Sequence, residues 1–261
     1  MIRCQVIQPH RLFLAIACWV AVAAVAQTDT RRSGFEFMRP DTQAMQRDDT
    51  LNPGMLWVRQ GEKLWQQATA SGAKSCAGCH ADASSSMHGV AARYPAWDER
   101  TQGPLNLAQR INQCRQNHQQ TQPWRLESQE LLALESFVGY QSRGMPLAPQ
   151  ASTRLQPHLD NGQRLFQQRM GQLNLSCAQC HDQNAGRHLG GNVIPQAHPT
   201  GYPIYRLEWQ AVGSLQRRLR NCMNGVRAEP YAMGARELVE LELYLAVRAR
   251  GMPVETPGIR P

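Results

Sequence analysis

Two segments of the chain repeat one pattern of apolar and polar positions. Residues Gln129–Pro146 and Arg236–Pro253 share eight of their eighteen residues. Apolar side chains recur in each at intervals of three and four, the spacing that places them on one face of an α-helix. These stripes are Leu131, Leu134 and Val138 in the first segment and Leu238, Leu241 and Leu245 in the second. Each segment therefore predicts an amphipathic helix, closed by Gly-Met-Pro.

A second pair of segments extends the repeat towards the N-terminus. The stretch "GEKLWQQ" begins at Gly61 and "GQRLFQQ" begins at Gly162, and each begins 15 residues before a cysteine. Between the copies, the proline-rich residues 146–157 lack periodicity and predict a linker. We therefore expect an all-α fold of two modules in tandem, one over residues 27–150 and the other over residues 151–261.

The N-terminus has a different pattern, with one continuous apolar run. Residues Leu12–Ala26 follow the basic residues Arg3 and Arg11 and end in Ala-Val-Ala. This order predicts a secretory signal peptide over residues 1–26, cleaved after export to the periplasm. A membrane anchor is the alternative, but the run has 15 residues and a span needs about 20. We expect no membrane span in the mature chain.

The chain is basic, with a formal charge of +8 that falls to +6 when Arg3 and Arg11 leave with the signal. A basic exported protein favours anionic small molecules or acidic partner surfaces. The sequence contains no nucleic-acid-binding motif, and its arginines are scattered along the chain. We therefore expect no nucleic-acid partner.

Six cysteines remain once Cys4 and Cys18 are removed with the signal, and four of them form two C-x-x-C-H motifs. The two thiols of such a motif add to the vinyl groups of one haem, and the histidine binds its iron. Disulfides or a zinc site are the alternative, since disulfides are common in an oxidising compartment. Two such motifs favour two covalently bound haem c groups. The attachment residues would be Cys76, Cys79, Cys177 and Cys180, with His80 and His181 as iron ligands.

The last two cysteines, Cys114 and Cys222, occupy a third repeated position, about 30 residues before each Gly-Met-Pro. The segments that lead to them, 103–115 and 212–221, have helical spacing of apolar residues. Three states compete: a disulfide between the two cysteines, two free thiols, or axial ligation of each iron by thiolate. We favour ligation, because each cysteine has its own matching place in its own module.

Met145 and Met252 of the two Gly-Met-Pro segments are the competing sixth ligands. Thiolate lowers the reduction potential of a haem and methionine raises it, so the two ligand sets differ measurably. The other role for these methionines is to end a helix and pack, which we favour. Trp65 and Phe166 occupy matching positions and are expected in the core.

Arg218 precedes Cys222 by four residues, so the two share a face of a helix. A guanidinium offers paired donors and a fixed positive charge to an oxyanion. Arg110 has the same place before Cys114, so spacing alone leaves open which module is active. The extra cations Arg217 and Arg220 favour the second, although each could equally lie on a solvated face. Four histidines without common spacing are expected at the surface or in loops: His88, His118, His188 and His198.

Two C-x-x-C-H modules, each with a later cysteine, and the R-x-x-x-C of Arg218 and Cys222 resemble the SoxA family of sulfur-oxidising bacteria. The resemblance spans about Trp57 to Pro253. It implies histidine–cysteine ligation of both haems, with Cys114 and Cys222 as the axial sulfurs. It also implies that Cys222 is the reactive sulfur, able to carry an extra sulfur as a persulfide, and that Arg218 binds the anionic substrate.

The resemblance implies an enzyme, an L-cysteine S-thiosulfotransferase that joins thiosulfate oxidatively to a cysteine of a carrier protein, SoxY. A monohaem cytochrome, SoxX, is the implied partner in a heterodimer and takes the electrons. Two other functions remain open from the residues: a dihaem thiosulfate dehydrogenase that forms tetrathionate, and a dihaem electron carrier. The dehydrogenase class has cysteine ligation at one haem only, and a carrier needs no arginine beside its ligand.

Overall fold

The helices expected from the repeat are present in the computed structural model, which describes residues 29–69 and 72–261. The predicted signal peptide, residues 1–26, lies outside the described residues, together with Cys4 and Cys18. Residues Arg31–Pro261 form one compact unit. None of the helices in this described part combines the length and the apolar character that a bilayer crossing requires.

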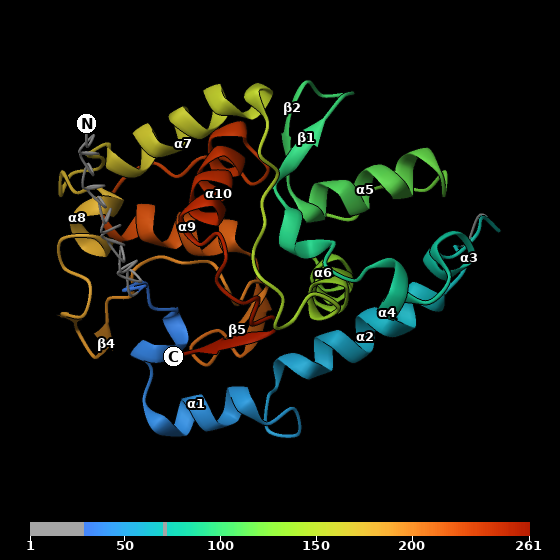
Figure 1. The fold of residues 1–261 in the computed structure, drawn as a ribbon, viewed down its shortest axis with the longest axis horizontal. Helices are drawn as coiled ribbons and strands as arrows, with labels where there is room; N and C mark the ends of the chain where they lie inside the picture. The colour runs from blue at the N-terminus through green and yellow to red at the C-terminus, as the bar shows by residue number, and fades with distance from the viewer. Residues whose placement is uncertain (1–28, 70–71) are drawn as a thin grey trace, which may run out of the picture. The chain divides into compact units, whose positions relative to one another are not determined.

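The first copy of the repeat runs from α2 to α6 (Figure 1). Its helices are α2 (Gly54–Gln66), α3 (Cys76–His80), α4 (Ala83–Ser86), α5 (Leu107–Asn117) and α6 (Gln129–Tyr140), with the 3-10 turn η2 (Ala91–Arg93). An antiparallel hairpin of β1 (Ala96–Asp98) and β2 (Gly103–Leu105) leads into α5. Helix α2 packs along α6, and α5 contacts α6.

The second copy has the corresponding long helices, motif helix and hairpin in the same order, with an additional hairpin where the first copy has α4 and η2. Its helices are α7 (Gln156–Gln167), α8 (Cys177–His181), α9 (Leu215–Gly225) and α10 (Arg236–Arg248), preceded by the 3-10 turn η3 (Thr153–Leu155). Its hairpins are β3 (His188–Leu189) with β4 (Asn192–Val193), and β5 (Ile204–Arg206) with β6 (Ala211–Gly213). Helix α7 packs along α10, as α2 does along α6.

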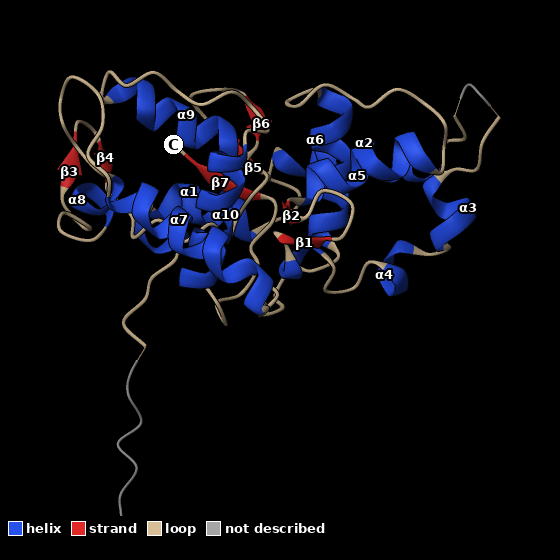
Figure 2. Cartoon of the chain, turned by 90° about the horizontal axis from the view of Figure 1, so that it is seen from above, coloured by secondary structure: helices blue, strands red, loops and turns tan. Residues whose placement is uncertain are grey.

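Segments outside the two copies tie the ends of this unit together. The 3-10 turn η1 (Gly34–Phe37) and helix α1 (Pro40–Arg47) precede the first copy, and strand β7 (Gly258–Arg260) ends the chain. Strand β7 joins β5 in parallel, and α1 lies beside it (Figure 1). In Figure 2 the strands appear as short pieces among the helices, so the fold is mainly helical, as expected.

The predicted amphipathic helices bury their stripes. In α6 and α10, all six stripe residues are at most 3% exposed: Leu131, Leu134, Val138, Leu238, Leu241 and Leu245. Trp65 and Phe166 are buried at matching places, which confirms the prediction that they belong to the core. A glycine lies at each helix crossing, because a Cβ at Gly61 or Gly162 would collide with a main-chain carbonyl oxygen of the partner helix. The absence of a side chain lets the two backbones approach closely.

The two Gly-Met-Pro segments pair with each other rather than only ending helices. Pro146 and Pro253 form an antiparallel bridge. The amide of Leu147 donates to the carbonyl of Met252, and the amide of Val254 donates to the carbonyl of Met145, each at 2.8 Å. Corresponding residues therefore exchange the same hydrogen bonds, and the two copies are joined here by a local two-fold relation.

The hairpins were not expected from the sequence. The helical spacing seen over residues 103–115 and 212–221 begins too early, because the first residues of both segments form strands β2 and β6. The helices start at Leu107 and Leu215, where Asn106 and Ser214 accept hydrogen bonds from the backbone three residues on. Such N-caps satisfy amides that a helix end leaves without partners, and so they fix the boundary.

Candidate functional site

Each C-x-x-C-H motif forms a short helix at the edge of its module's core. Ser75 and Ser176 cap α3 and α8 by accepting hydrogen bonds from backbone amides. None of the motif residues is buried. Apolar side chains that pack, like the motifs, against the core of their module stay partly exposed, among them Met87, Val90, Tyr94 and Trp124 in the first copy and Met170, Leu215, Leu219 and Tyr231 in the second. These surfaces suit a large apolar group.

The two motif histidines differ in their contacts. The Nδ1 atom of His181 lies 2.7 Å from the carbonyl oxygen of Pro195. A carbonyl only accepts, so Nδ1 carries the proton and Nε2 is left to bind a metal, as in many metal-binding histidines. The ring of His80 packs 5.8 Å from that of Trp65. Paired free thiols, a histidine and a partly exposed apolar surface together fit a haem c group.

The repeated cysteines lie close to the attachment motif of their own module. Burial, and then the charge of Cys222, raise the pKa of Cys177 to about 11. In the first copy, burial and then the charge of Cys114 raise the pKa of Cys76. Helices α5 and α9 carry Cys114 and Cys222, as expected. All six described cysteines are free, which argues against a disulfide between Cys114 and Cys222.

The methionines of the two Gly-Met-Pro segments serve the joint between the copies. Met252 is 7% exposed and packs in a small apolar cluster with Leu147, Ala249 and Val254. The carbonyl of Met145 accepts from Val254 across the same joint. The packing of Met252 and the backbone contact of Met145 fit the structural role that the sequence favoured for them.

The two arginines that precede the repeated cysteines have different surroundings. Arg110 forms an ion pair with Asp98, with 2.9 Å between Nη2 and Oδ1. Asp98 is 3% exposed, and it also accepts hydrogen bonds from Thr101 and Gln113. Within the described residues, the guanidinium of Arg218 has no carboxylate partner. The corresponding arginines are therefore neutralised in the first copy and not in the second.

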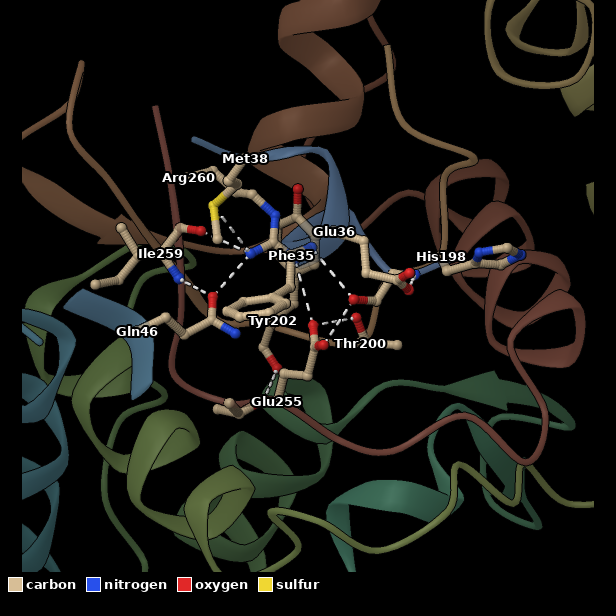
Figure 3. Close-up of polar contacts among 12 residues, drawn as sticks. Phe35, Glu36, Met38, Gln46, His198, Thr200, Tyr202, Glu255, Ile259 and Arg260 are labelled. Carbon is tan, nitrogen blue, oxygen red and sulfur yellow. Dashed lines mark hydrogen bonds and ion pairs between the residues drawn. The ribbon is translucent and has the colours of Figure 1, made fainter. Parts of the chain in front are cut away.

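Two further residues lie near Arg218 and Cys222 that the sequence analysis did not select. Arg206, on β5, is 7% exposed. Tyr202 precedes β5, and its position is seen in Figure 3. Burial raises the pKa of Tyr202, and the charges of Arg218, Arg206 and Cys222 also act on it. The four side chains therefore belong to one electrostatic neighbourhood.

A cavity of about 360 Å³ opens beside His181. Its lining includes Asp182, Gln196, His198 and Arg248. His198 lies in a loop, as expected, but it is buried rather than at the surface, and its Nδ1 lies 2.8 Å from the carbonyl oxygen of Arg32. The other three histidines expected at the surface or in loops are exposed: His88, His118 and His188.

Polar contacts hold the end of the chain over the second copy (Figure 3). Glu255 accepts from Thr200 at 2.7 Å and lies 3.4 Å from the Arg260 guanidinium. Arg260 also donates to Gln46 of α1 at 2.9 Å. The charge of Arg260 acts on Tyr202 as well, but this arginine has a carboxylate partner of its own.

Two helical modules, each with a haem-attachment motif at the edge of its core, define a tandem c-type cytochrome. The profile of the SoxA/TsdA cytochrome c domain matches residues 60–147 and 161–254. The L-cysteine S-thiosulfotransferase subunit SoxA of Pseudaminobacter salicylatoxidans is 36% identical over 89% of this chain and 82% of that protein. The subunit of the same name from Rhodovulum sulfidophilum is 34% identical, over 89% and 81%.

A solved structure agrees with these sequence relationships. A crystal structure of SoxXA from P. pantotrophus contains a chain that is 33% identical and superposes with a TM-score of 0.85, covering 90% of this chain and 88% of that one. The chain belongs to the SoxA family. The tandem fold expected from the repeat is confirmed, and cytochrome c domains imply covalently bound haem c.

Proposed function

We propose that this protein is the haem-carrying subunit of an L-cysteine S-thiosulfotransferase. It would join thiosulfate to a cysteine thiol of a carrier protein. A sulfur–sulfur bond forms between the terminal sulfur of thiosulfate and the cysteine sulfur, the thiol proton is released, and two electrons are removed. The observation that carries the proposal is the unpaired Arg218 beside Cys222, next to the second attachment motif. Family membership supports the same reaction, because curated relatives have this name.

Two haem c groups would be held by corresponding residues. The thiols of Cys76 and Cys79 would attach the first and those of Cys177 and Cys180 the second. His80 with Cys114, and His181 with Cys222, would supply the axial ligands. When bound, the second group would supply the route by which electrons leave the site. The sulfur of Cys222 would be the one at which substrate is processed, and it would carry an extra sulfur as a persulfide.

Arg218 would reduce the repulsion between the anionic substrate and the Cys222 thiolate. Thiosulfate carries two negative charges, and the Cys222 thiolate is also negative. Their approach is opposed by a Coulomb energy that grows as water is excluded. A guanidinium one helical turn away reduces this repulsion and offers paired donors to the sulfonate oxygens.

The proposal includes the compartment and the partners. The predicted signal peptide over residues 1–26 would deliver the chain to the periplasm, leaving modules over residues 27–150 and 151–261, with the active site in the second. A small monohaem cytochrome of the SoxX kind would form a heterodimer with this chain and accept the electrons. A SoxY-like protein with a C-terminal cysteine arm would be the sulfur carrier.

The test compares two corresponding arginines. Arg218→Ala should keep both haems and lose activity by about 30- to 1000-fold, because removing one buried anion-binding donor costs about 2–4 kcal/mol in the transition state. Lysine at position 218 should restore only part of the rate, since an ammonium lacks the paired donors. Steady-state turnover with thiosulfate, carrier protein and a cytochrome acceptor measures this.

The control is Arg110→Ala. The partner of Arg110, Asp98, keeps its hydrogen bonds to Thr101 and Gln113, so turnover should change little. Full activity in Arg218→Ala, or loss of activity only in Arg110→Ala, would show that the second module is not the site.

A further inference from the structure

The two copies correspond without a gap from their hairpins to their repeated cysteines. A cis Tyr-Pro bond begins each stretch, at Tyr94 and Tyr202, and each stretch ends in its cysteine. The second copy follows the first by 108 positions throughout. The hairpin registers agree, since Asp98 pairs with Gly103 and Arg206 pairs with Ala211. Asp98 and Arg206 therefore occupy the same place in the two modules.

The two copies carry opposite charges at this corresponding position, which in the first copy lies beside the arginine that precedes the cysteine. In the first copy, the buried carboxylate of Asp98 lies 2.9 Å from Arg110. In the second copy, the same strand position is occupied by Arg206, which is also buried. Burial lowers the pKa of Arg206, and the charge of Arg218 lowers it further. The two cations therefore lie close enough to repel each other.

Little in the described residues compensates this second cation. The Nε atom of Arg206 is buried and has no hydrogen-bond partner there. Glu208 lies 3.1 Å from that atom, but its side chain is 47% exposed and in contact with water, which weakens the attraction. The guanidinium also lies 5.2 Å from the ring of Trp209. A buried cation whose carboxylate partner is largely in water, and which lies beside another cation, is costly unless an anion joins them.

We propose that Arg206 and Arg218 together form a binding site for a doubly charged oxyanion next to Cys222, and that thiosulfate is this anion. The proposal rests on the proposed function and names the groups that select its substrate. Two guanidiniums balance the charge of −2, and each offers several N–H donors to the oxygens of the anion. The first copy lacks this site because Asp98 already neutralises its arginine.

Haem propionates are the competing anions for Arg206. The charge of Arg206 interacts with that of Cys222, the expected axial sulfur. An anion held between Arg206 and Arg218 would lie beside the sulfur at which the proposed reaction takes place, which favours substrate over a propionate.

The test uses the haem-loaded protein and measures binding apart from turnover. Isothermal titration with thiosulfate, and with sulfate as an unreactive dianion, gives Kd. Arg206→Met should weaken binding of both by about 10- to 150-fold, as expected for the loss of hydrogen bonds to a charged group. It should raise KM for thiosulfate while the haem absorption spectrum stays as in the parent. Arg206→Lys should recover part of the affinity.

Arg206→Asp is the sharpest variant. It recreates the pair that Asp98 and Arg110 form in the first copy, so the fold already accommodates this arrangement. Dianion binding should be lost to a greater extent than in Arg206→Met, because the introduced carboxylate would neutralise Arg218. The matched control is Arg217→Met, which removes an equal charge from an arginine that also lies against Trp209, 4.1 Å from its ring, and should leave Kd unchanged.

Three outcomes overturn the proposal: parent-like affinity in Arg206→Met, equal loss in Arg217→Met, or altered haem spectra and potential with unchanged Kd. The last would indicate a propionate partner. Failure of the proposed function looks different. In that case the parent would bind dianions through Arg206 and yet leave the carrier thiol unmodified, which supports this site while rejecting the reaction.

Discussion

At the scale of single residues, the proposed ligation by the repeated cysteines would set the properties of both haem sites. Thiolate opposite histidine at both irons should give low-spin thiolate-type signals in electron paramagnetic resonance of the oxidised protein. Cys222→Ala should remove one of two such signals and leave the other. Met252→Leu should leave both, because Met252 packs in the joint between the copies. A sulfur-to-iron charge-transfer band of histidine–methionine haem at both sites would contradict this and favour Met145 and Met252.

Site residues that recur in both copies could be predicted from the sequence, and those that differ between the copies could not. Cys114, Cys222 and their arginines were found because the same residue types recur at the same place. Asp98 and Arg206 were missed, since opposite charges at corresponding positions do not look like a repeat. Only the hairpin register shows that the two positions are equivalent. His198 lies in a loop as expected, but its burial could not be predicted because it depends on contacts distant in sequence, such as that with Arg32.

At the scale of elements, the same helix crossing appears in both copies. A methyl group at Gly61 or Gly162 would meet the main chain of α6 or α10, and backbone cannot move aside as a side chain can. We expect Gly61→Ala and Gly162→Ala each to lower the free energy of unfolding by about 1–3 kcal/mol, as overpacking does. Chemical denaturation followed by circular dichroism measures this.

Gly225 provides the control for these crossings. It ends α9, and a Cβ there would meet nothing within 4 Å. Gly225→Ala should therefore leave stability within about 0.5 kcal/mol of the parent. Equal effects at all three glycines would show that helix propensity, and not the close approach of helices, governs these positions.

The long helices could be predicted from their periodicity, but the short strands could not. The stripes of α6 and α10 span three turns, and burial follows the pattern closely. Strands β1, β2, β5 and β6 have three residues each, too few for alternation to be visible. Their turns need a left-handed residue, supplied by Gln102 and Gln210 with φ of 50°, and glutamine gives no sequence signal for that.

At the scale of the whole molecule, the contact between the two copies contains carboxyl groups with few cations near them. Glu135 of α6 and Glu242 of α10 are corresponding residues in the repeat. Burial, and then the charges of Glu242 and Glu127, raise the pKa of Glu135 to about 8. Burial likewise raises the pKa of Glu242 to about 7, although hydrogen bonds from Asn106 and Gln216 oppose the change. A cavity of about 20 Å³ beside them has room for one water.

Because of these raised pKa values, the stability of the folded protein depends on pH between about 4.5 and 8. Both acids have an ordinary pKa of 4.5, so between about pH 4.5 and 8 the folded protein holds protons that the unfolded chain has released. The free energy of unfolding therefore falls as pH rises through this window.

Glu135→Gln removes one titrating group, so the stability of the variant relative to the parent should rise from pH 5 to pH 8. Each kcal/mol of this relative gain corresponds to about 2–4 °C in Tm. Thermal unfolding of the haem-loaded protein at several pH values measures this. Glu130→Gln, exposed on the same helix, should follow the parent, and a Glu135→Gln curve parallel to the parent's would exclude this carboxyl as the source of the pH dependence.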